Sequence, residues 1–429
     1  MATDQAGINL LLLGSGGREH AMAIALAKSP LIGALYAAPG NPGMEGLAQI
    51  VALDPADHAA IAAFCKASKI GLVAVGPEAP LVAGLADDLG GQGVKVFGPS
   101  KAAAKLEGSK IFAKNFCRRF AVPSADYASF DEASPAILHV REKGAPIVIK
   151  ADGLAAGKGV TVAQNIAEAE AAIERMFAGE FGAASKRIVI EEFLEGEEVS
   201  FFALCDGTRA VELGSAQDHK RVGEGETGPN TGGMGAYSPA PIMDEAMRAR
   251  VMDEIIRPAL KGMAAMGAAF QGVLFAGLMI TAEGPKLIEF NVRLGDPEAQ
   301  VLLPRLEEDL LSLMLACAEG RLPGRALKLS PQTALTVVLA AKGYPGAPEK
   351  GSIIRGLERA AALPFITITH AGTRRLGADL IADGGRVLNV TALGANIAEA
   401  RARAYEAIAL IDWPGGFYRR DIGWRALGR

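Results

Sequence analysis

The chain has few cysteines, few aromatic residues, no long hydrophobic run and almost no excess of charge. Its four cysteines lie far apart in 429 residues and match no metal-ligand spacing, so neither a disulfide framework nor a cysteine-based metal site is expected. No stretch approaches the ~20 apolar residues of a membrane span. No basic segment precedes the short apolar run at residues 10–13, so a signal sequence is not expected. These absences predict a soluble, cytoplasmic protein.

The charge balance also limits the function. Forty-four basic and 48 acidic residues give a net charge of -4, which indicates neither a nucleic-acid groove nor a basic membrane face, although local basic clusters could still hold phosphates. The histidines form no close cluster in the sequence and no Gly-x-Ser-x-Gly elbow occurs, so triad hydrolysis is not supported. Phosphoryl transfer fits better, because it depends mainly on cations and positioning.

The order of expected elements divides the chain into α/β and α+β parts, and its length suggests about three domains. Alternating strands and helices over the first hundred residues predict a parallel sheet with helices on both faces. After a helix at 109–120, strands with few helices between them predict a more antiparallel unit, followed by a helix at 243–266 and a hairpin. A Pro/Gly-rich break precedes a small α+β tail. The expected domains are residues 1–108, 109–328 and 329–429; the expected strands are 8–13, 34–38, 70–75, 94–97, 147–151, 159–162, 187–193, 198–204, 272–280, 285–291, 334–341, 365–370 and 386–393.

The first strand ends in a glycine turn, Gly14-Ser-Gly16-Gly17-Arg18-Glu19, that opens a helix. Free backbone N–H groups and the helix dipole favour a phosphate there, and a tight structural turn is the alternative. A dinucleotide is disfavoured, because the third glycine of that motif would fall at Glu19 and no acid follows the second strand. Asn41 and Gly76-Pro77-Glu78 follow the next strands, at the same carboxyl edge of the sheet.

A second glycine loop, Gly157-Lys158-Gly159, follows Lys150. Lysines on and beside a mobile glycine loop suit a polyphosphate, and a hairpin turn with solvated lysines is the alternative. The spacing is not that of a Walker loop, and Lys158 is followed by Gly rather than Ser or Thr.

Two carboxylate-rich strand ends follow. The run from Glu191 to Glu198 could accept the hydroxyls of a ribose, or it could be an acidic solvated turn. Strand alternation places Glu289, Asn291 and Arg293 on one face. Such a face suits Mg²⁺ bridged to phosphate, and a solvated edge strand is the alternative.

The segment from Asp218 to Pro239 contains six glycines and almost no large apolar residue, so it is expected to lie outside the core. Such segments are usually binding loops or disordered ones. The charges of Asp218, Lys220 and Arg221 favour a binding loop over a linker.

These motifs, together with Gly295-Asp-Pro-Glu298 and the Gly228 to Pro239 run, resemble the phosphoribosylamine–glycine ligases of the ATP-grasp superfamily. The similarity runs from Gly14 to Arg425, and the ordered set is highly specific. The resemblance implies an ATP-dependent enzyme of purine biosynthesis that joins glycine to 5-phosphoribosylamine through glycyl phosphate, with Mg²⁺ or Mn²⁺. We expect a monomer with no nucleic-acid or membrane partner.

The resemblance also implies roles for individual residues. ATP would contact Lys110, Lys150, Gly157, Lys158, Gly159, Glu191, Glu192, Phe193, Leu194 and Glu198, and the metal would lie on Glu289 and Asn291. Phosphoribosylamine would take Gly14, Gly16, Gly17, Arg18, Glu19, Asn41, Gly76, Pro77 and Glu78. Glycine and the acyl phosphate would take Asp218, Lys220, Arg293, Thr231, Gly232 and Gly233.

One departure and several rivals remain. Family members tend to carry Asp in the stretch after His219-Lys-Arg221, where this chain has Glu224-Gly-Glu226, so no direct role is assigned to these two glutamates. The 218–221 and 228–239 segments argue against a formate-using purine enzyme or a biotin carboxylase. A nucleotide-regulated binding protein without turnover would bind ATP without releasing ADP in response to glycine.

Overall fold

The first hundred residues form a parallel sheet. The computed structural model describes residues 7–154 and 159–428. The strands lie in the order β3-β2-β1-β4-β5 and every pair is parallel, which confirms the prediction. Their bounds are β1 (Ile8–Gly14), β2 (Ile32–Pro39), β3 (Gln49–Ile50), β4 (Ile70–Val75) and β5 (Val96–Phe97).

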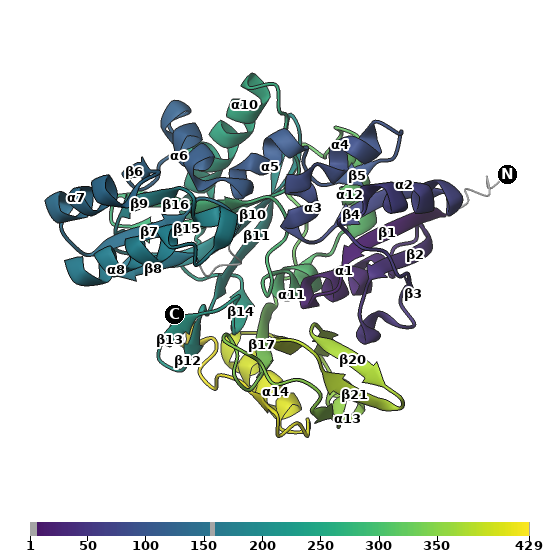
Figure 1. Ribbon diagram of the computed structural model, residues 1–429. Helices are drawn as coiled ribbons and strands as arrows, with labels where there is room; N and C mark the ends of the chain where they lie inside the picture. Colours follow the sequence, from purple (N-terminus) through teal and green to yellow (C-terminus); the bar gives the residue numbers. More distant parts are fainter. Residues whose placement is uncertain (1–6, 155–158, 429) are drawn as a thin grey trace.

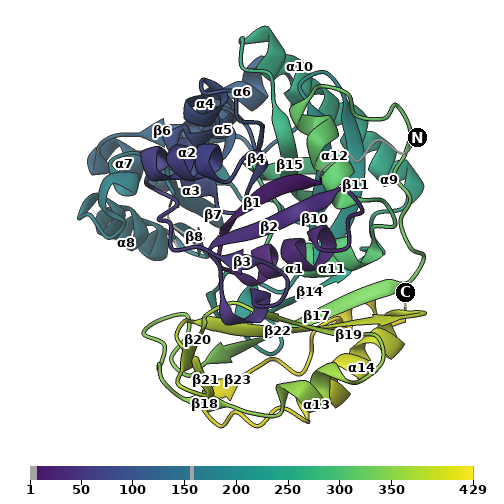
Figure 2. The ribbon, with the colours of Figure 1, turned by 90° about the vertical axis from the view of Figure 1, so that its right-hand side faces the viewer.

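Helices cover both faces of this sheet (Figure 2). Leu10 and Leu12 of β1 belong to the core formed with α1 (Gly17–Leu26), while Leu11 and Leu13 belong to the core formed with α2 (His58–Ala67) and α3 (Glu78–Ala83). The helical segment after β4 is divided into α3 and α4 (Leu85–Gly90), because Gly84 takes a left-handed φ of 106° between them.

A second, antiparallel sheet has the order β6-β9-β7-β8 and follows the connecting helices α5 (Lys101–Gly108) and α6 (Lys110–Arg119). It contains β6 (Tyr127–Phe130), β7 (Ile147–Ala151), β8 (Val160–Ala163) and β9 (Ile188–Glu192). Few helices were expected here, but α7 (Ala133–Lys143) and α8 (Ile166–Phe177) pack on the sheet. Alanines such as Ala136 and Ala169 form much of their buried faces, so the helical hydrophobic pattern is weak.

The largest sheet has nine strands and joins the middle of the chain to its tail (Figure 1). Its order is β16-β15-β10-β11-β14-β17-β22-β19, with β23 paired to β17. The strands are β10 (Glu197–Asp206), β11 (Ala210–Asp218), β14 (Gly235–Ser238), β15 (Gln271–Thr281), β16 (Gly284–Asn291), β17 (Thr333–Ala341), β19 (Ile366–His370), β22 (Arg386–Gly394) and β23 (Gly416–Phe417).

Strand β14 corrects the expectation that the whole 218–239 segment lies outside the core. Ala236 and Tyr237 have no exposed surface, and β14 pairs with β11 on one side and β17 on the other. Gly235 has a φ of 159°, and a side chain there would meet the Thr336 carbonyl 2.6 Å away. The small residues therefore allow a strand to pass through a crowded sheet. The preceding residues form a hairpin, β12 (Arg221–Gly223) and β13 (Thr227–Asn230).

The remaining elements surround these sheets. The helix expected over 243–266 is confirmed, with a π-helical turn inside it. No helix in the described ranges has the length and apolar character to cross a membrane. The other bounds are α9 (Glu245–Val251), η3 (Met252–Ile256), α10 (Arg257–Ala265), α11 (Ala299–Leu302), η4 (Leu303–Arg305), α12 (Leu310–Ala318), α13 (Leu357–Ala361), α14 (Ile397–Ile408), β18 (Ile353–Ile354), β20 (Thr373–Leu376), β21 (Asp379–Ala382), η1 (Pro42–Met44), η2 (Gly182–Ser185) and η5 (Trp424–Ala426).

Candidate active site

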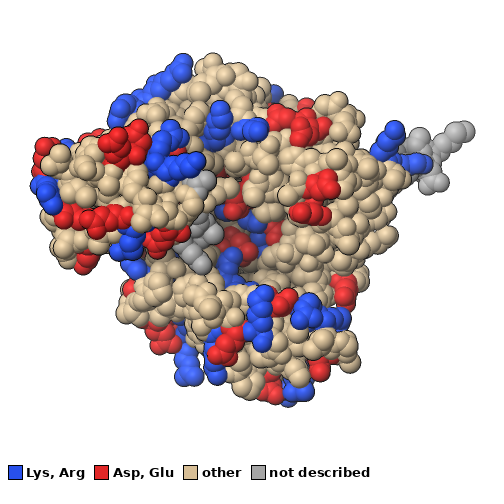
Figure 3. All heavy atoms as spheres, viewed as in Figure 1, with Lys and Arg blue, Asp and Glu red and all other residues tan. Residues whose placement is uncertain are grey.

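A hollow lies in the middle of one face, between the parts of the chain described above, and both positive and negative side chains line it (Figure 3). The charged groups singled out from the sequence come from different elements: Lys110 begins α6, Lys150 lies in β7, Glu289 lies in β16, and Asp218 ends β11. Lys110, Lys150 and Lys220 all act on the Glu289 carboxyl, and Lys220 also acts on Asp218, so the fold brings these groups close together.

Glu191 holds two lysines below this surface. Its Oε2 accepts hydrogen bonds from Lys150 Nζ and Lys114 Nζ, each at 3.0 Å, and all three side chains are buried. Burial lowers the pKa of Lys114, and its neighbour Lys150 lowers it further, while Glu191 opposes the shift. Glu191 was expected to contact ATP; in the structure its carboxylate is bonded to these lysines. Lys114 was not predicted from the sequence, although its spacing from Lys110 places both on one helical face.

Lys110 connects α6 to the loop after β7. Its backbone N–H donates to the Asp152 carbonyl at 3.0 Å, and its Nζ lies 3.4 Å from the Gly153 carbonyl. Asp152 Oδ1 accepts from the backbone N–H of Ile111 at 2.8 Å, which fixes the start of the helix beside the loop. The predicted phosphate residues Gly157 and Lys158 lie outside the described residues, while Gly159 accepts a bond from Ala151 N–H at 2.8 Å.

Four cationic side chains act on the carboxylate of Glu289. Burial acts to raise the pKa of its carboxyl, but Lys220, Lys110, Lys150 and Arg293 more than offset this and lower it overall. The carboxylate is therefore ionised at neutral pH. A carboxylate surrounded by several cations suits a site that also receives phosphate oxygens or a metal.

The metal prediction rests on Glu289 and Asn291, two residues apart on β16 and so on the same face. Within the described ranges, no three His, Cys, Asp or Glu side chains converge as a metal site. Mg²⁺ usually takes one or two carboxylates from the protein, together with substrate phosphates and water. The ionised Glu289 carboxylate and the Asn291 amide oxygen fit that donor set.

Asp218 and Glu298 form an acidic group next to Lys220. Burial raises the pKa of Asp218 to about 7, with Glu298 and Glu198 adding to the shift and Lys220 opposing it. Burial also raises the pKa of Glu298, whose Oε1 accepts from Ser200 Oγ at 3.0 Å. Lys220 pairs with Glu198, so the predicted ribose acceptor already has a cationic partner. Glu298 belongs to the Gly295–Glu298 motif, for which no separate role was predicted.

Arg293 joins the middle of the chain to the N-terminal sheet. Its guanidinium binds Glu107 at 2.9 Å and Glu78 at 3.2 Å. Burial opposes its charge, but Glu107 and Glu78 together raise the pKa of Arg293 above its ordinary value. Glu107 was missed; it is buried and also accepts from the backbone N–H of Val292 at 2.7 Å. The guanidinium is thus held in one orientation by carboxylates from two parts of the chain.

The Gly14–Glu19 turn is built around the Glu19 carboxylate. Gly16 N–H donates to Glu19 Oε2 at 2.7 Å, so this backbone donor, expected to be free for a phosphate, is already occupied. Arg18 Nε donates to Glu19 Oε1 at 2.5 Å. A side chain at Gly76 would lie 1.9 Å from Glu19 Oε1, so Gly76 is required for the carboxylate to pack against it.

Asn41 uses its whole amide within the protein. Its Nδ2 donates to the carbonyls of Ser15 at 2.8 Å and His370 at 2.9 Å, and its Oδ1 accepts from Gly43 N–H at 2.9 Å. The residue is buried. These bonds link the glycine turn to the tail, and the contact of Asn41 with phosphoribosylamine stays a prediction.

The Thr231–Gly233 turn is fixed by residues that sequence analysis missed. Thr231 Oγ1 donates to the Lys220 carbonyl at 2.8 Å and accepts from Gly233 N–H at 3.0 Å. From the tail, Arg386 Nη1 donates to the Gly232 carbonyl at 2.6 Å and Tyr344 Oη accepts from Gly232 N–H at 2.9 Å. The Gly-Gly-Arg run ahead of the 386–393 strand was the available signal for Arg386.

The glutamates that depart from the family pattern hold the C-terminal segment. Arg419 has 1% of its side chain exposed and bonds to Glu226 at 2.7 Å and Asp421 at 2.8 Å. Arg425 also contacts Glu226, at 3.0 Å. Glu224 accepts from the backbone N–H of Arg420 at 3.0 Å. Both glutamates therefore attach the β12–β13 hairpin to the tail.

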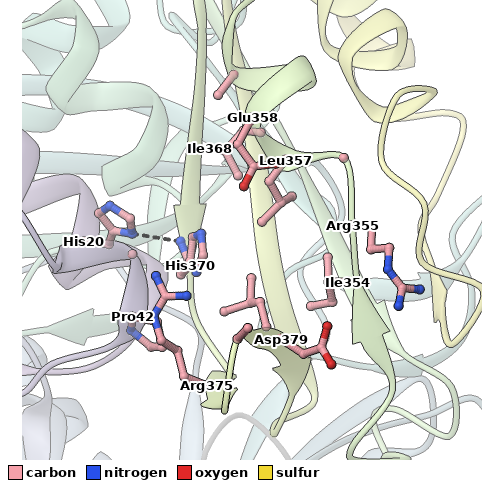
Figure 4. Close-up of a pocket in the computed structure, with 15 residues that line it drawn as sticks. His20, Pro42, Ile354, Arg355, Leu357, Glu358, Ile368, His370, Arg375 and Asp379 are labelled. Atoms are coloured by element: carbon pink, nitrogen blue, oxygen red, sulfur yellow. Dashed lines mark hydrogen bonds between the residues drawn. The ribbon is translucent and has the colours of Figure 1, made fainter.

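A cavity of about 480 Å³ lies between α1 and the tail (Figure 4). His20 Nδ1 accepts a hydrogen bond from the backbone N–H of His370 at 2.8 Å, drawn as the dashed line. Burial lowers the pKa of His20 to about 3, with His370 contributing, and burial lowers the pKa of His370 to about 4. Both imidazoles are neutral at physiological pH and connect the N-terminal part to the tail.

Comparisons with known proteins cover nearly the whole chain. Three family descriptions match in order: the N domain of phosphoribosylglycinamide synthetase over residues 8–107, its ATP-grasp (A) domain over 108–299 and its C domain over 334–425. The phosphoribosylamine–glycine ligase of Mesorhizobium japonicum is 61% identical over 422 residues, which cover 98% of this chain and 99% of the relative. The chloroplastic ligase of Arabidopsis thaliana is 55% identical, over 96% of this chain and 79% of the relative.

Solved structures agree with these matches. The crystal structure of the phosphoribosylamine–glycine ligase of Thermotoga maritima superposes with a TM-score of 0.83 at 33% identity, over 97% of this chain and all of that one. A biotin carboxylase of Campylobacter jejuni has a TM-score of 0.73 over 95% of this chain and 92% of its own, at 17% identity, which shows a shared fold alone.

Proposed function

This chain belongs to the phosphoribosylglycinamide synthetase family, and from that membership we propose that it is the ATP-dependent ligase that joins glycine to 5-phosphoribosylamine. The products are N1-(5-phosphoribosyl)glycinamide, ADP and phosphate, a step of purine biosynthesis. The observation that carries the proposal is the set of four cations, Lys110, Lys150, Lys220 and Arg293, around the ionised Glu289. Such a set stabilises the negative charge of a transferring phosphoryl group.

In the first step, the carboxylate of glycine attacks the γ-phosphorus of ATP, ADP leaves, and glycyl phosphate forms. Lys110 and Lys150 would bind the phosphate oxygens, and Lys114 and Glu191 would hold Lys150 in place. Glu289 and Asn291 would hold Mg²⁺ or Mn²⁺, which when bound offsets phosphate charge. We assign the adenine to the 191–194 backbone and the ribose to Glu198, whose present partner Lys220 would have to share it.

Glycine would lie beside the acidic group. The ammonium of glycine needs acceptors, and half-buried Asp218 with buried Glu298 offers carboxyl oxygens next to Lys220. Arg293, held by Glu78 and Glu107, would face the acyl phosphate. The Thr231–Gly233 turn, fixed by Arg386 and Tyr344, would bring backbone groups close to the same ligand.

In the second step, the amine of phosphoribosylamine attacks the carbonyl of glycyl phosphate, loses a proton, and phosphate leaves. We assign this substrate to the first domain, residues 1–108, near Gly14–Glu19 and Gly76–Glu78. The ATP-grasp unit would span 109–328 and the tail 329–429. Because Arg293 bonds to Glu78, the acceptor site and the phosphoryl-transfer site share one ion-pair network. Water must be excluded from the site, because it would hydrolyse the acyl phosphate.

A coupled assay tests the function. The protein is incubated with ATP, Mg²⁺ and glycine, with or without phosphoribosylamine generated in place, and ADP and glycinamide ribonucleotide are measured. We expect ADP release that requires glycine. Release that ignores glycine, or that is equal with alanine, would contradict the proposal, and ATP binding without turnover would favour a regulated binding protein.

The metal assignment has its own test. Glu289→Ala should abolish turnover while the circular dichroism spectrum and the thermal midpoint stay close to those of the wild type. Glu283→Ala is the matched control, because Glu283 is 78% exposed in the turn that leads into the same strand and pairs only at the surface with Lys286. Normal turnover of the Glu289 variant would refute the metal role.

A further inference from the structure

A second cavity, of about 380 Å³, lies where β11, the 239–243 segment, α9 and the 329–331 segment meet. None of the residues assigned to the ligase reaction lines it. Its polar lining consists of Glu212, Ser215, Arg248 and Arg305, and its apolar lining includes Met243 and Leu329. A cavity of this size lies within the ordinary range of small-molecule sites, ~300–1,000 Å³.

Arg305 brings a positive charge into this cavity, and no carboxylate among the described residues bonds to it. The residue is 7% exposed. Its guanidinium donates to the Gln332 carbonyl at 2.7 Å, to Ser238 Oγ at 2.8 Å and to the Ser330 carbonyl at 3.0 Å, which are all neutral oxygens. Burial lowers the pKa of Arg305, and Arg248 lowers it further. A buried cation held only by neutral groups is stabilised by any anion that enters beside it.

Arg248 adds a second guanidinium with an unsatisfied donor. Its Nη1 lies 3.4 Å from Glu212 Oε1, a long contact. Its Nε is buried and has no hydrogen-bond partner among the residues that the structure describes. Burial raises the pKa of Glu212, so that carboxyl is a weakened counter-charge for Arg248. Buried polar donors without partners are rare and usually indicate a ligand or water.

We propose that this cavity binds a small oxyanion, a carboxylate or a phosphoryl group, carried on a compact apolar body. The planar guanidinium groups of Arg248 and Arg305 recognise two oxygens of such a group. Met243 and Leu329 provide apolar contacts for its body. The site is separate from the ligase reaction and does not depend on the proposed function.

Calorimetric titration tests the site in the full-length protein saturated with ADP and Mg²⁺, so that the nucleotide site is filled. Benzoate and phenyl phosphate are the two anionic probes, and benzyl alcohol is their neutral analogue. We expect saturable binding of at least one anion, with little or none for the alcohol. The stronger of the two anions shows whether the site prefers a carboxylate or a phosphoryl group.

Matched variants then locate the binding. Arg248→Met should weaken the bound anion about tenfold or more, because a charge-assisted hydrogen bond is lost. Arg250→Met, on the same helix, should leave the affinity unchanged, since Arg250 pairs with Glu254 at 2.7 Å instead. Arg305→Lys keeps the charge but loses the planar fork and should also weaken binding. Equal losses in the two helix variants, binding of the alcohol as strong as that of the anions, or no saturable binding would overturn the proposal.

Discussion

Replacing Glu191 by Gln should destabilise the protein substantially, because one carboxylate holds two buried lysines. Lys114 Nζ and Lys150 Nζ each lie 3.0 Å from Glu191 Oε2, with side-chain exposures of 4–5%. Removing one partner of a buried ion pair costs about 3–5 kcal/mol, since the remaining charge is left unpaired. Gln retains the shape and one acceptor, so we expect about 3 kcal/mol. For a domain of the size of the 109–328 unit, that corresponds to a fall of roughly 6–12 °C in the thermal midpoint.

The pH dependence of the loss follows from the lysines. The folded-state pKa of Lys114 is already lowered, and without Glu191 it should fall further. Between the lowered folded pKa and the ordinary value of 10.5, the unfolded chain binds more protons than the folded one, so stability rises with pH. The deficit of the Gln variant should therefore shrink as the pH is raised from 7 towards 10.

Differential scanning calorimetry from pH 7 to 10 measures both the loss of stability and its decrease with rising pH. In a separate ATP titration, the Glu191 variant should show a raised Kd, because Lys150 is no longer held in place. Glu192→Gln is the control for the calorimetry, because Glu192 is the exposed next residue of the same strand. The reasoning is refuted if the Glu191 variant melts within about 1 °C of the control at pH 7, or if its deficit grows with pH.

Four further predictions concern other parts of the site and the C-terminal segment. Glu298→Gln should move the acidic limb of kcat/KM to lower pH, because Glu298 helps to raise the pKa of Asp218 to about 7; an unmoved limb would exclude Asp218 as its source. That raised pKa also means that stability falls as pH rises from about 3.8 to about 7, and Asp218→Asn should remove this fall in thermal scans. Gly76→Ala, whose Cβ would lie 1.9 Å from Glu19 Oε1, should impair the use of phosphoribosylamine but leave the ATP affinity unchanged; normal KM values for both would contradict the packing argument. Glu226→Ala should cost about 1–3 kcal/mol, because the buried Arg419 loses one carboxylate, whereas Glu224→Ala should cost less; equal thermal midpoints would show that Glu226 is dispensable.

The local patterns of the sequence predicted the helices and strands that have a clear pattern of large apolar residues. The parallel first sheet followed from apolar runs that alternate with helices, and Leu10 to Leu13 pack on both faces as expected. Helices α7 and α8 were missed because alanine forms much of their buried surface. The division at Gly84 depends on one backbone angle, which a helical pattern does not specify.

The candidate site also has a part that the sequence predicted and a part that only the structure shows. The sequence by itself determined the family, the charged motifs and the residue types that suit phosphate and metal. It did so because these depend on composition and order along the chain. Only the tertiary structure decided which partners each charge has: Lys114 on Glu191, Glu107 on Arg293, and Arg386 on the Gly232 turn. The residues in these three pairs lie 77, 186 and 154 positions apart in the chain.

The glycine-rich segment shows the physical reason most clearly. Its composition indicated a loop, since glycine and small polar residues bury little apolar surface. In the structure, its residues Gly235–Ser238 form β14, the strand through which the nine-stranded sheet reaches the tail, with Tyr237 fully buried. Whether a glycine serves mobility or close packing depends on what lies against it. That neighbour, the Thr336 carbonyl 2.6 Å from the position of a Gly235 side chain, comes from a distant strand that only the folded chain brings there.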